Sequence, residues 1–132
     1  MAVQKASKDE NHTIVLSYTV MIESYDFGQI TISGRRYSRD VIIFPDNVKD
    51  GWWRKEGHRL SLEDLTDVFE AQPEVLVIGT GYSGLMKVPQ DVKDYVESKR
   101  IELVVENTRQ ACQTYNRLCQ SKRAIAAFHL TC

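Results

Sequence analysis

The sequence predicts a single α/β domain that has antiparallel strands in its first third and a parallel sheet in its second half. Its 132 residues are the length of one domain, enough to bury about two thirds of the unfolded surface. Strand and helix patterns alternate from residue 75 onward, which indicates parallel strands joined by right-handed crossovers. The runs 75–78 and 124–128 are continuously apolar, as in strands covered on both faces of a sheet. We therefore expect the N-terminal strands to cover one face and the helices the other.

The first third of the chain is expected to be a flexible tail followed by strands. Residues 1–12 are polar and have little apolar surface to bury, so order is expected to begin near Thr13. A single domain would then cover residues 13–132. The β-branched and aromatic residues, the alternating patterns and the turn residues predict strands at 13–23, 29–32 and 37–44.

Capping residues and apolar periodicity predict the remaining elements. Ser61 with Asp64 three residues later resembles a capping signal, and apolar spacing extends that helix to about Ala71. Pro89 suits the first turn of a helix that begins there. The expected order is helix 61–71, strand 75–78, helix 89–99, strand 101–105, helix 108–121 and strand 123–130.

The most informative motif is a glycine-rich turn directly after strand 75–78. Gly79-Thr80-Gly81-Tyr82-Ser83-Gly84 reads as G-x-G-x-x-G, and Glu106 follows at the expected distance of roughly 20 residues. A dinucleotide site also needs a helix that begins inside the turn, so that its amide groups point at phosphate. Because Pro89 indicates a later helix start, we favour a backbone turn that leaves the sheet. A nucleotide, another phosphate or a different small ligand remains the alternative.

Charge, apolar runs and cysteine spacing exclude several functions. With 17 basic and 18 acidic residues the net charge is −1, so no overall attraction to nucleic acid or anionic lipid is expected. The polar start and the strand-length apolar runs predict neither secretion nor a membrane span, and we expect a cytoplasmic protein. The three cysteines form neither a disulfide framework nor a C-x-x-C pair, so no metal site and no cofactor are expected.

A string of residues from the glycine turn to the last position points to a known family. It comprises Val77-Ile78-Gly79-Thr80-Gly81, Val88-Pro89, Thr108 with Ala111, Tyr115-Asn116 and His129-Leu130-Thr131-Cys132. Together with Phe27-Gly28 and the stretch 53–58, this string resembles the Mth-nine-three-eight-like domain family. That family includes small archaeal and bacterial proteins, the adipogenesis-associated protein bearing that domain and a mitochondrial respiratory complex I assembly factor.

The resemblance implies a three-layer domain around a central mixed sheet of about five strands. Helices would lie on one side, and a small N-terminal β layer plus a helix on the other. The resemblance implies no catalytic residues, because the family has none established, and it favours binding to partner proteins. Relatives also retain the first two glycines but not the third, which favours the structural interpretation of the turn.

The candidate pocket residues surround the carboxyl ends of the predicted parallel strands, where open α/β sheets bind ligands. They are Gly79, Thr80, Gly81, Tyr82, Asn116 and His129. His129 would need a nearby carboxylate or metal for chemistry, and Glu106 is the expected partner. We favour a hydrogen-bonded structural histidine over a ligand pocket or catalysis. Cys132 and His129 are expected on opposite sides of the last strand, so a Cys-His dyad is not expected. Asn116 is expected to bond loop backbone, with the pocket as alternative.

The candidate interface residues are Trp52, Trp53, Arg54 and His58. Adjacent residues of an extended chain point to opposite sides, so one tryptophan is expected to be partly exposed. Aromatic residues and arginine anchor protein interfaces, and Arg54 with His58 would form the polar rim. Core capping is the alternative.

The leading hypothesis is a non-enzymatic accessory or assembly domain that binds a partner protein or self-associates. The sequence has no carboxylate pair, metal-ligand spacing, Ser-His-Asp set or phosphate-loop lysine that would supply a reaction. The alternative is a small-molecule or nucleotide-binding protein or enzyme with its pocket near the 79–84 turn.

Overall fold

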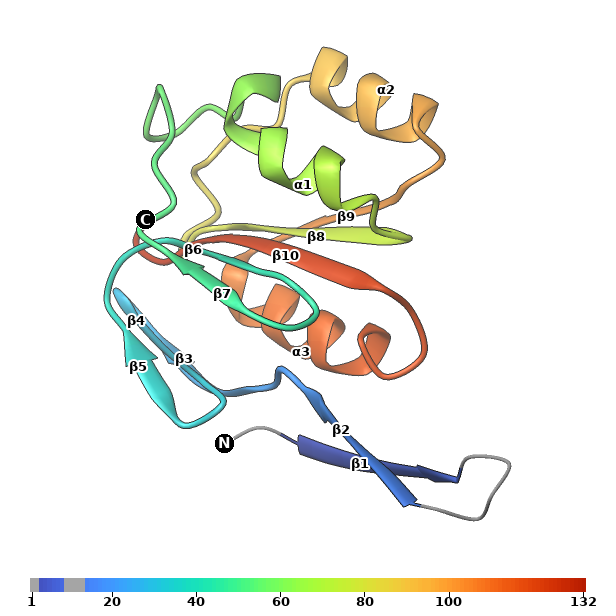
Figure 1. Ribbon diagram of the computed structural model, residues 1–132. Helices are drawn as coiled ribbons and strands as arrows, with labels where there is room; N and C mark the ends of the chain where they lie inside the picture. The colour runs from blue at the N-terminus through green and yellow to red at the C-terminus, as the bar shows by residue number, and fades with distance from the viewer. Residues whose placement is uncertain (1–2, 9–13) are drawn as a thin grey trace.

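The computed structural model describes residues 3–8 and 14–132, and its centre is a mixed five-stranded sheet (Figure 1). The strand order is β7-β6-β10-β8-β9. β10 and β9 each pair in parallel with β8, whereas β6 is antiparallel to β10 and β7 to β6. The strands are β6 (Val41–Ile43), β7 (Val48–Asp50), β8 (Val75–Thr80), β9 (Glu102–Glu106) and β10 (Ala124–His129).

Different elements cover the two faces of this sheet (Figure 1). On one face lie the short helix η1 (Leu62–Leu65), α1 (Thr66–Ala71) and α2 (Gln90–Ser98). On the other lie α3 (Thr108–Leu118) and an antiparallel sheet of β3 (Ile22–Asp26), β4 (Gln29–Ile32) and β5 (Arg35–Tyr37). The predicted three-layer α/β class is therefore confirmed.

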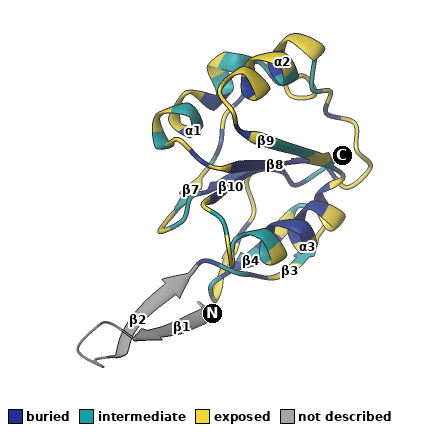
Figure 2. Cartoon of the chain, turned by 90° about the vertical axis from the view of Figure 1, so that its right-hand side faces the viewer, coloured by how far each residue is buried: buried dark blue, intermediate teal, exposed yellow. Residues whose placement is uncertain are grey.

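The two central strands are buried because each face of them enters a separate core. Val75 and Val77 of β8 pack in the cluster beneath the sheet, with α3 and the antiparallel strands. Leu76 and Ile78 pack in the cluster on the α1/α2 side. Figure 2 accordingly shows β8 and β10 as buried throughout, while the outer strand β9 is intermediate and exposed. This explains why the runs 75–78 and 124–128 lack polar alternation.

The predicted strand 37–44 is wrong as one element. The chain forms β5 in the small sheet and β6 in the central sheet, with residues 38–40 between them. β7 was not predicted, because 48–50 has one apolar residue and pairs with β6 through its backbone. The turn between β6 and β7 is closed by the Phe44 N–H, which donates to the Asn47 carbonyl (2.8 Å).

Part of the predicted tail has regular backbone structure. β1 (Val3–Lys8) pairs antiparallel with β2 (Ile14–Thr19), which the sequence did not predict for residues before Thr13. Main-chain pairing of this kind requires no buried side chain, and the sequence argument depended on burial. The domain boundary placed at residue 13 lies outside the described residues and stays a prediction.

Candidate functional site

The glycine turn after β8 fits tightly between neighbouring elements. A Cβ atom on Gly79 would lie 2.8 Å from both Phe128 Cδ1 and Thr108 Oγ1. Gly81 has a φ of +109°, and its Cβ would lie 2.6 Å from the Cys132 carbonyl. Both glycines are therefore needed for close backbone approach, and Gly81 also for its left-handed conformation.

The amide groups of this turn bond to the chain itself. The Tyr82 N–H donates to the Thr131 carbonyl (2.6 Å), and the Leu85 N–H donates to the Cys132 carbonyl (3.1 Å). The Gly81 N–H donates to Thr108 Oγ1 (2.8 Å). A dinucleotide fingerprint would offer such groups to phosphate. Here backbone carbonyls after β10 and the Thr108 hydroxyl at the start of α3 accept these hydrogen bonds instead of a phosphate.

The helix that follows the turn begins late, as predicted. α2 starts at Gln90 with Pro89 as its N-cap residue, so no helix N-terminus follows directly from Gly84. Glu106, the acid of the dinucleotide-type motif, also has a hydrogen-bond partner within the domain. Glu106 ends β9, and its carboxylate accepts from the Thr114 hydroxyl (2.7 Å).

A buried polar cluster, formed by Asp40, Arg54 and His129, lies at the carboxyl end of β10. Asp40 directly precedes β6, Arg54 lies in the loop after β7, and His129 is the last residue of β10. Arg54 Nη1 donates to Asp40 Oδ2 (2.8 Å), and Arg54 Nη2 donates to the Gly57 carbonyl (2.9 Å). His129 Nδ1 lies 2.8 Å from Asp40 Oδ2, and the Leu130 N–H donates to Asp40 Oδ1 (2.8 Å). One carboxylate thus joins two sheet strands and a loop.

The network determines the tautomer of His129. Burial raises the pKa of Asp40, but hydrogen bonds from His129, the Leu130 N–H and Arg54 outweigh it and hold that pKa below its ordinary value. An ionised carboxylate only accepts, so His129 Nδ1 carries the hydrogen and donates to it. The 3.0 Å approach of Arg54 Nη2 to the same nitrogen is then a packing contact. His129 Nε2 lies 3.5 Å from Thr131 Oγ1.

The carboxylate partner of His129 is Asp40, so the expected partner Glu106 is wrong. β6 runs antiparallel beside β10, which brings Asp40 next to His129 although they lie far apart in the sequence. The only local signal for Asp40 was an acid placed directly before an apolar strand. His129 is only 6 % exposed and its ring nitrogens face side chains of this domain, a geometry that agrees with a hydrogen-bonded structural histidine.

The other predicted pocket residues have partners of their own. Thr80 stands opposite His129 in the β8–β10 ladder. Thr80 Oγ1 donates to the Glu106 carbonyl (3.1 Å), while the Tyr82 ring is 46 % exposed at the surface. Asn116 lies on α3, where its side-chain amide accepts from the Ile22 N–H (2.9 Å) and donates to the Ile22 carbonyl (2.8 Å). Asn116 therefore bonds backbone, the favoured interpretation, but the backbone is that of β3.

The tryptophan pair divides between the interior and the surface. Trp52 is buried at 4 % exposure, and its Nε1 donates to the Asp64 carbonyl (2.9 Å), whereas Trp53 is 76 % exposed. The expectation that one ring is exposed is confirmed. Arg54 stacks on the Trp52 ring, with Cζ 4.6 Å from the ring centroid. Because Arg54 is buried, its predicted place in a polar rim is wrong; His58 is exposed, with its ring 5.5 Å from that of His129.

Two further features are an exposed aromatic pair and a buried cysteine. Phe27 and Tyr82 form an exposed edge-to-face pair (5.8 Å between centroids), with the Arg109 guanidinium 5.4 Å from the Tyr82 ring centroid. Cys112, in contrast, is buried, and burial raises the pKa of its thiol to about 12, so the thiol stays protonated near neutral pH. In the part of the chain that the structure describes, no group of three or more His, Cys, Asp or Glu side chains could hold a metal ion.

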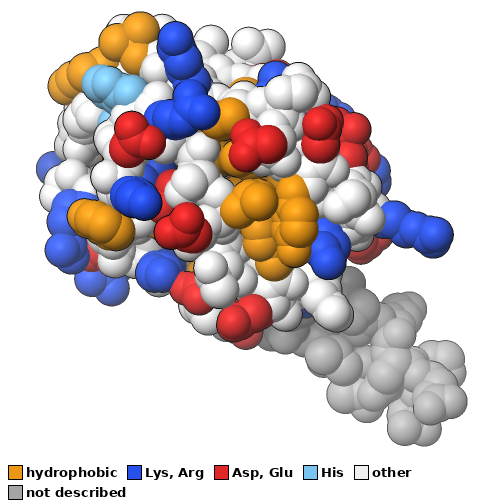
Figure 3. Space-filling model, turned by 90° about the horizontal axis from the view of Figure 1, so that it is seen from above, with side chains coloured by type: hydrophobic (Ala, Val, Ile, Leu, Met, Phe, Trp, Pro, Cys, Tyr) orange, Lys and Arg blue, Asp and Glu red, His pale blue; other side chains and the backbone are white. Residues whose placement is uncertain are grey.

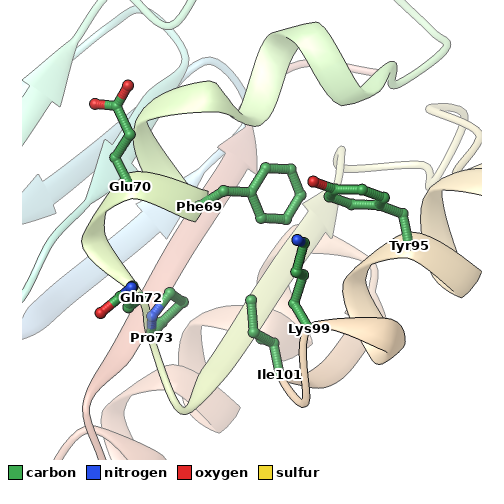
Figure 4. Close-up of a pocket in the computed structure, with 7 residues that line it drawn as sticks. All are labelled: Phe69, Glu70, Gln72, Pro73, Tyr95, Lys99 and Ile101. Atoms are coloured by element: carbon green, nitrogen blue, oxygen red, sulfur yellow. The ribbon is translucent and has the colours of Figure 1, made fainter.

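A groove lies between α1 and α2, away from the glycine turn. It has a volume of about 510 Å³, and Figure 4 shows Phe69 of α1 directed toward Tyr95 of α2, with Lys99 beside them. The two rings meet edge to face at 5.1 Å. Figure 3 shows hydrophobic side chains gathered near the middle of this face, among charged ones. Two smaller grooves, of about 360 and 190 Å³, adjoin Trp53 and Asn116 respectively.

A family model described as "Protein of unknown function (DUF498/DUF598)" matches residues 22–130 of this chain. The chain belongs to this family. Two solved structures similar to this DUF498/DUF598 domain are the conserved hypothetical protein PH1505 from Pyrococcus horikoshii OT3 and a protein named MT938. PH1505 has a TM-score of 0.73 at 27 % identity, covering 84 % of this chain and 98 % of its own. MT938 has a TM-score of 0.72 at 27 % identity, covering 86 % and 100 %.

A Mth938-like domain from Bordetella pertussis shares the fold, with a TM-score of 0.57 at 20 % identity. Its match covers 84 % of this chain and 85 % of that one. The resemblance found in the sequence is therefore confirmed.

Curated relatives of this DUF498/DUF598 domain include NADH dehydrogenase (ubiquinone) 1 alpha subcomplex assembly factor 3. The Mus musculus protein is 31 % identical over 111 residues, which cover 82 % of this chain and 58 % of that protein. The Homo sapiens protein is 28 % identical over 109 residues, covering 80 % and 58 %. The match thus spans less than two thirds of the length of these two curated relatives. No helix among residues 3–8 and 14–132 is long and apolar enough to cross a membrane.

Proposed function

We propose that this protein is an accessory or assembly-type domain that acts by binding a partner protein. The observation that carries the proposal is Trp53, which is 76 % exposed beside a tryptophan that is fixed in the core. Tryptophan is enriched among residues that dominate binding energy, and a ring held on a fixed loop loses little entropy on binding. The names of the assembly-factor relatives support the same class of function.

The surroundings of Trp53 support a protein contact. The groove of about 360 Å³ beside it is lined by both tryptophans together with lysines and acids, an aromatic centre with a charged edge. Lys49 and Asp67 at this edge form an exposed ion pair (2.7 Å). His58, the other exposed residue of the predicted interface, remains part of the proposal. A second copy of the chain is the other occupant that the sequence left open.

Single alanine variants of the two tryptophans test this proposal. We expect Trp52→Ala to cost about 3 to 5 kcal/mol of unfolding free energy, since it empties a core position. We expect Trp53→Ala to change that free energy by less than about 0.5 kcal/mol but to weaken partner association by roughly 2 kcal/mol or more. Unfolding in urea gives the first quantity, and quantitative co-purification with the tagged chain from its own cells gives the second.

A matched control is Leu85→Ala, which truncates another exposed apolar residue (52 %). Association that survives Trp53→Ala as well as it survives Leu85→Ala would contradict the proposal. Sedimentation of the purified protein distinguishes self-association from a foreign partner. The cytoplasmic location expected from the sequence remains a prediction.

A further inference from the structure

β9 is an outer strand of the central sheet, and its other side has no strand among the described residues. It pairs in parallel with β8, and the Glu102 N–H donates to the Glu74 carbonyl (3.0 Å). Peptide groups of alternate residues point to opposite sides of a strand, so those of Leu103 and Val105 point away from β8. Within the described part of the chain, no other strand pairs with β9, and no turn, cap or side chain bonds these peptide groups.

The side chains of β9 suit an added strand. Leu103 is half-buried against the α1/α2 core, and Val105, on the same face, is 37 % exposed. Val104 packs against the opposite core. The strand contains no proline, glycine or lysine, the residues that usually discourage edge pairing. A neighbouring strand would therefore cover apolar surface as well as satisfy the outward main-chain groups.

The other outer strands of the five-stranded and three-stranded sheets are protected. β7, on the opposite side of the sheet in Figure 2, has three residues, and Lys49 at its centre is ion-paired with Asp67. β5 is equally short and carries two arginines. At β3 the Asn116 side chain bonds both main-chain groups of Ile22, beside a register shift between Ile22 and Ser24. These are ordinary means of preventing edge pairing. β9 is longer, with five residues, and its two charged residues, Glu102 and Glu106, stand at its ends.

Charge selects the occupant of this edge. Glu102 forms an ion pair with Lys122 (2.9 Å). Among the described residues the Glu106 carboxylate has no cationic partner and accepts from the Thr114 hydroxyl. In an antiparallel pairing of two β9 strands centred on Val104, Glu102 would stand opposite Glu106 of the second copy. Like charges directly opposite destabilise a strand pair. A segment with a cation beside Glu106 fits better than a second copy.

We propose that the outer edge of β9 binds an extended segment of a partner protein as an added β-strand, with apolar residues beside Leu103 and Val105 and a lysine or arginine beside Glu106. The β9 edge is separate from the Trp53 loop. Binding of a strand at this edge does not depend on whether Trp53 contacts a partner. Main-chain hydrogen bonds supply affinity in this mode of recognition, and the side-chain contacts supply selectivity.

A short peptide tests this directly with the full chain. The probe is acetyl-Lys-Val-Thr-Val-Thr-Val-Lys-amide, which places a lysine beside Glu106 in either strand direction. Amide hydrogen exchange is followed by NMR on the isotope-labelled protein. At about ten times the Kd, the Leu103 and Val105 amides should exchange about tenfold more slowly, since only the free protein exchanges. The Val104 amide, which already faces β8, should not change.

Three controls make the outcome decisive. The same peptide with every valine and threonine N-methylated should lose binding, because it cannot donate to the edge in either strand direction. Glu106→Gln should weaken the peptide by up to about fivefold, the magnitude of an exposed ion pair. Trp53→Ala should bind the peptide like the wild type, which separates this surface from the proposed tryptophan contact. No protection at millimolar peptide, or protection elsewhere, would overturn the proposal. Concentration-dependent protection of Leu103 and Val105 without peptide, with dimers in sedimentation, would overturn it in favour of a second copy.

Discussion

At the carboxyl ends of β8 and β10, the turn amides of Gly81, Tyr82 and Leu85 all bond within the domain. Along the outer edge of β9, the peptide groups of Leu103 and Val105 point to solvent. Open α/β sheets bind ligands at the first kind of place, at the carboxyl ends of the strands. Here the chain uses the main-chain groups at that end to join its own elements, although the Tyr82 and Leu85 side chains there are exposed.

This contrast separates folding from binding. Residues at the carboxyl ends, such as Arg54 and Gly79, have close neighbours on several elements, so changes there should cost stability. Trp53 and Val105 have exposed side chains, so changes there should cost association and little stability. A glycine-rich turn in a parallel sheet is therefore not sufficient to indicate a phosphate site. The turn must also have free amide groups and a helix that starts within it.

The largest effect that tests the contrast is expected for Arg54→Ala. The substitution leaves the half-buried Asp40 without its cation and the Gly57 carbonyl without its donor. Removing one partner of a buried ion pair costs about 3 to 5 kcal/mol. Urea unfolding measures the loss. Arg39→Ala is the matched control, because the Arg39–Asp50 pair is exposed and should contribute less than about 1 kcal/mol. Equal costs for the two variants would refute the distinction.

A smaller loss is expected for Gly79→Val. Its new Cβ would meet Phe128 and Thr108 at 2.8 Å, and overpacking of this kind costs about 1 to 3 kcal/mol. Gly57→Ala is the control, since nothing lies within 4 Å of a Cβ there. Thermal unfolding of both variants decides the matter. A Gly79→Val protein that melts like the wild type but loses a partner or ligand would make the turn a binding site.

The fold was predictable because its signals are local. The apolar runs at 75–78 and 124–128 required strands covered on both faces, and they became β8 and β10. Pro89 fixed the late start of α2 for a steric reason that a single residue carries. The division of 37–44 between two sheets was not predictable, because nothing local shows that Tyr37 pairs with Ile30 while Val41 pairs with Phe128.

The buried polar cluster could not be predicted from the sequence, for a related reason. Asp40 and His129 meet only because β6 pairs antiparallel with β10, and no spacing in the chain reports that pairing. Arg54 was placed in an interface rim because arginine and aromatic residues are the types that anchor protein interfaces. Its partner Asp40 could not be identified beforehand. The exposure of one tryptophan was predictable, since adjacent residues on an extended chain face opposite ways.

The smallest expected effect is an acid dependence of stability that comes from Asp40. Hydrogen bonds from His129, the Leu130 N–H and Arg54 lower its pKa in the folded protein, despite the opposing effect of burial. A carboxyl group whose pKa is lowered by folding contributes its stability fully above the pKa of the unfolded chain, about 3.9. That contribution is lost as the pH falls from there through the folded pKa. The free energy of unfolding should therefore fall more steeply below about pH 4 in the wild type than in Asp40→Asn. Urea titrations at a series of pH values measure both slopes. Parallel slopes would show that Asp40 gains no proton on acid unfolding, and that the cluster at the end of β10 is not held by its charge.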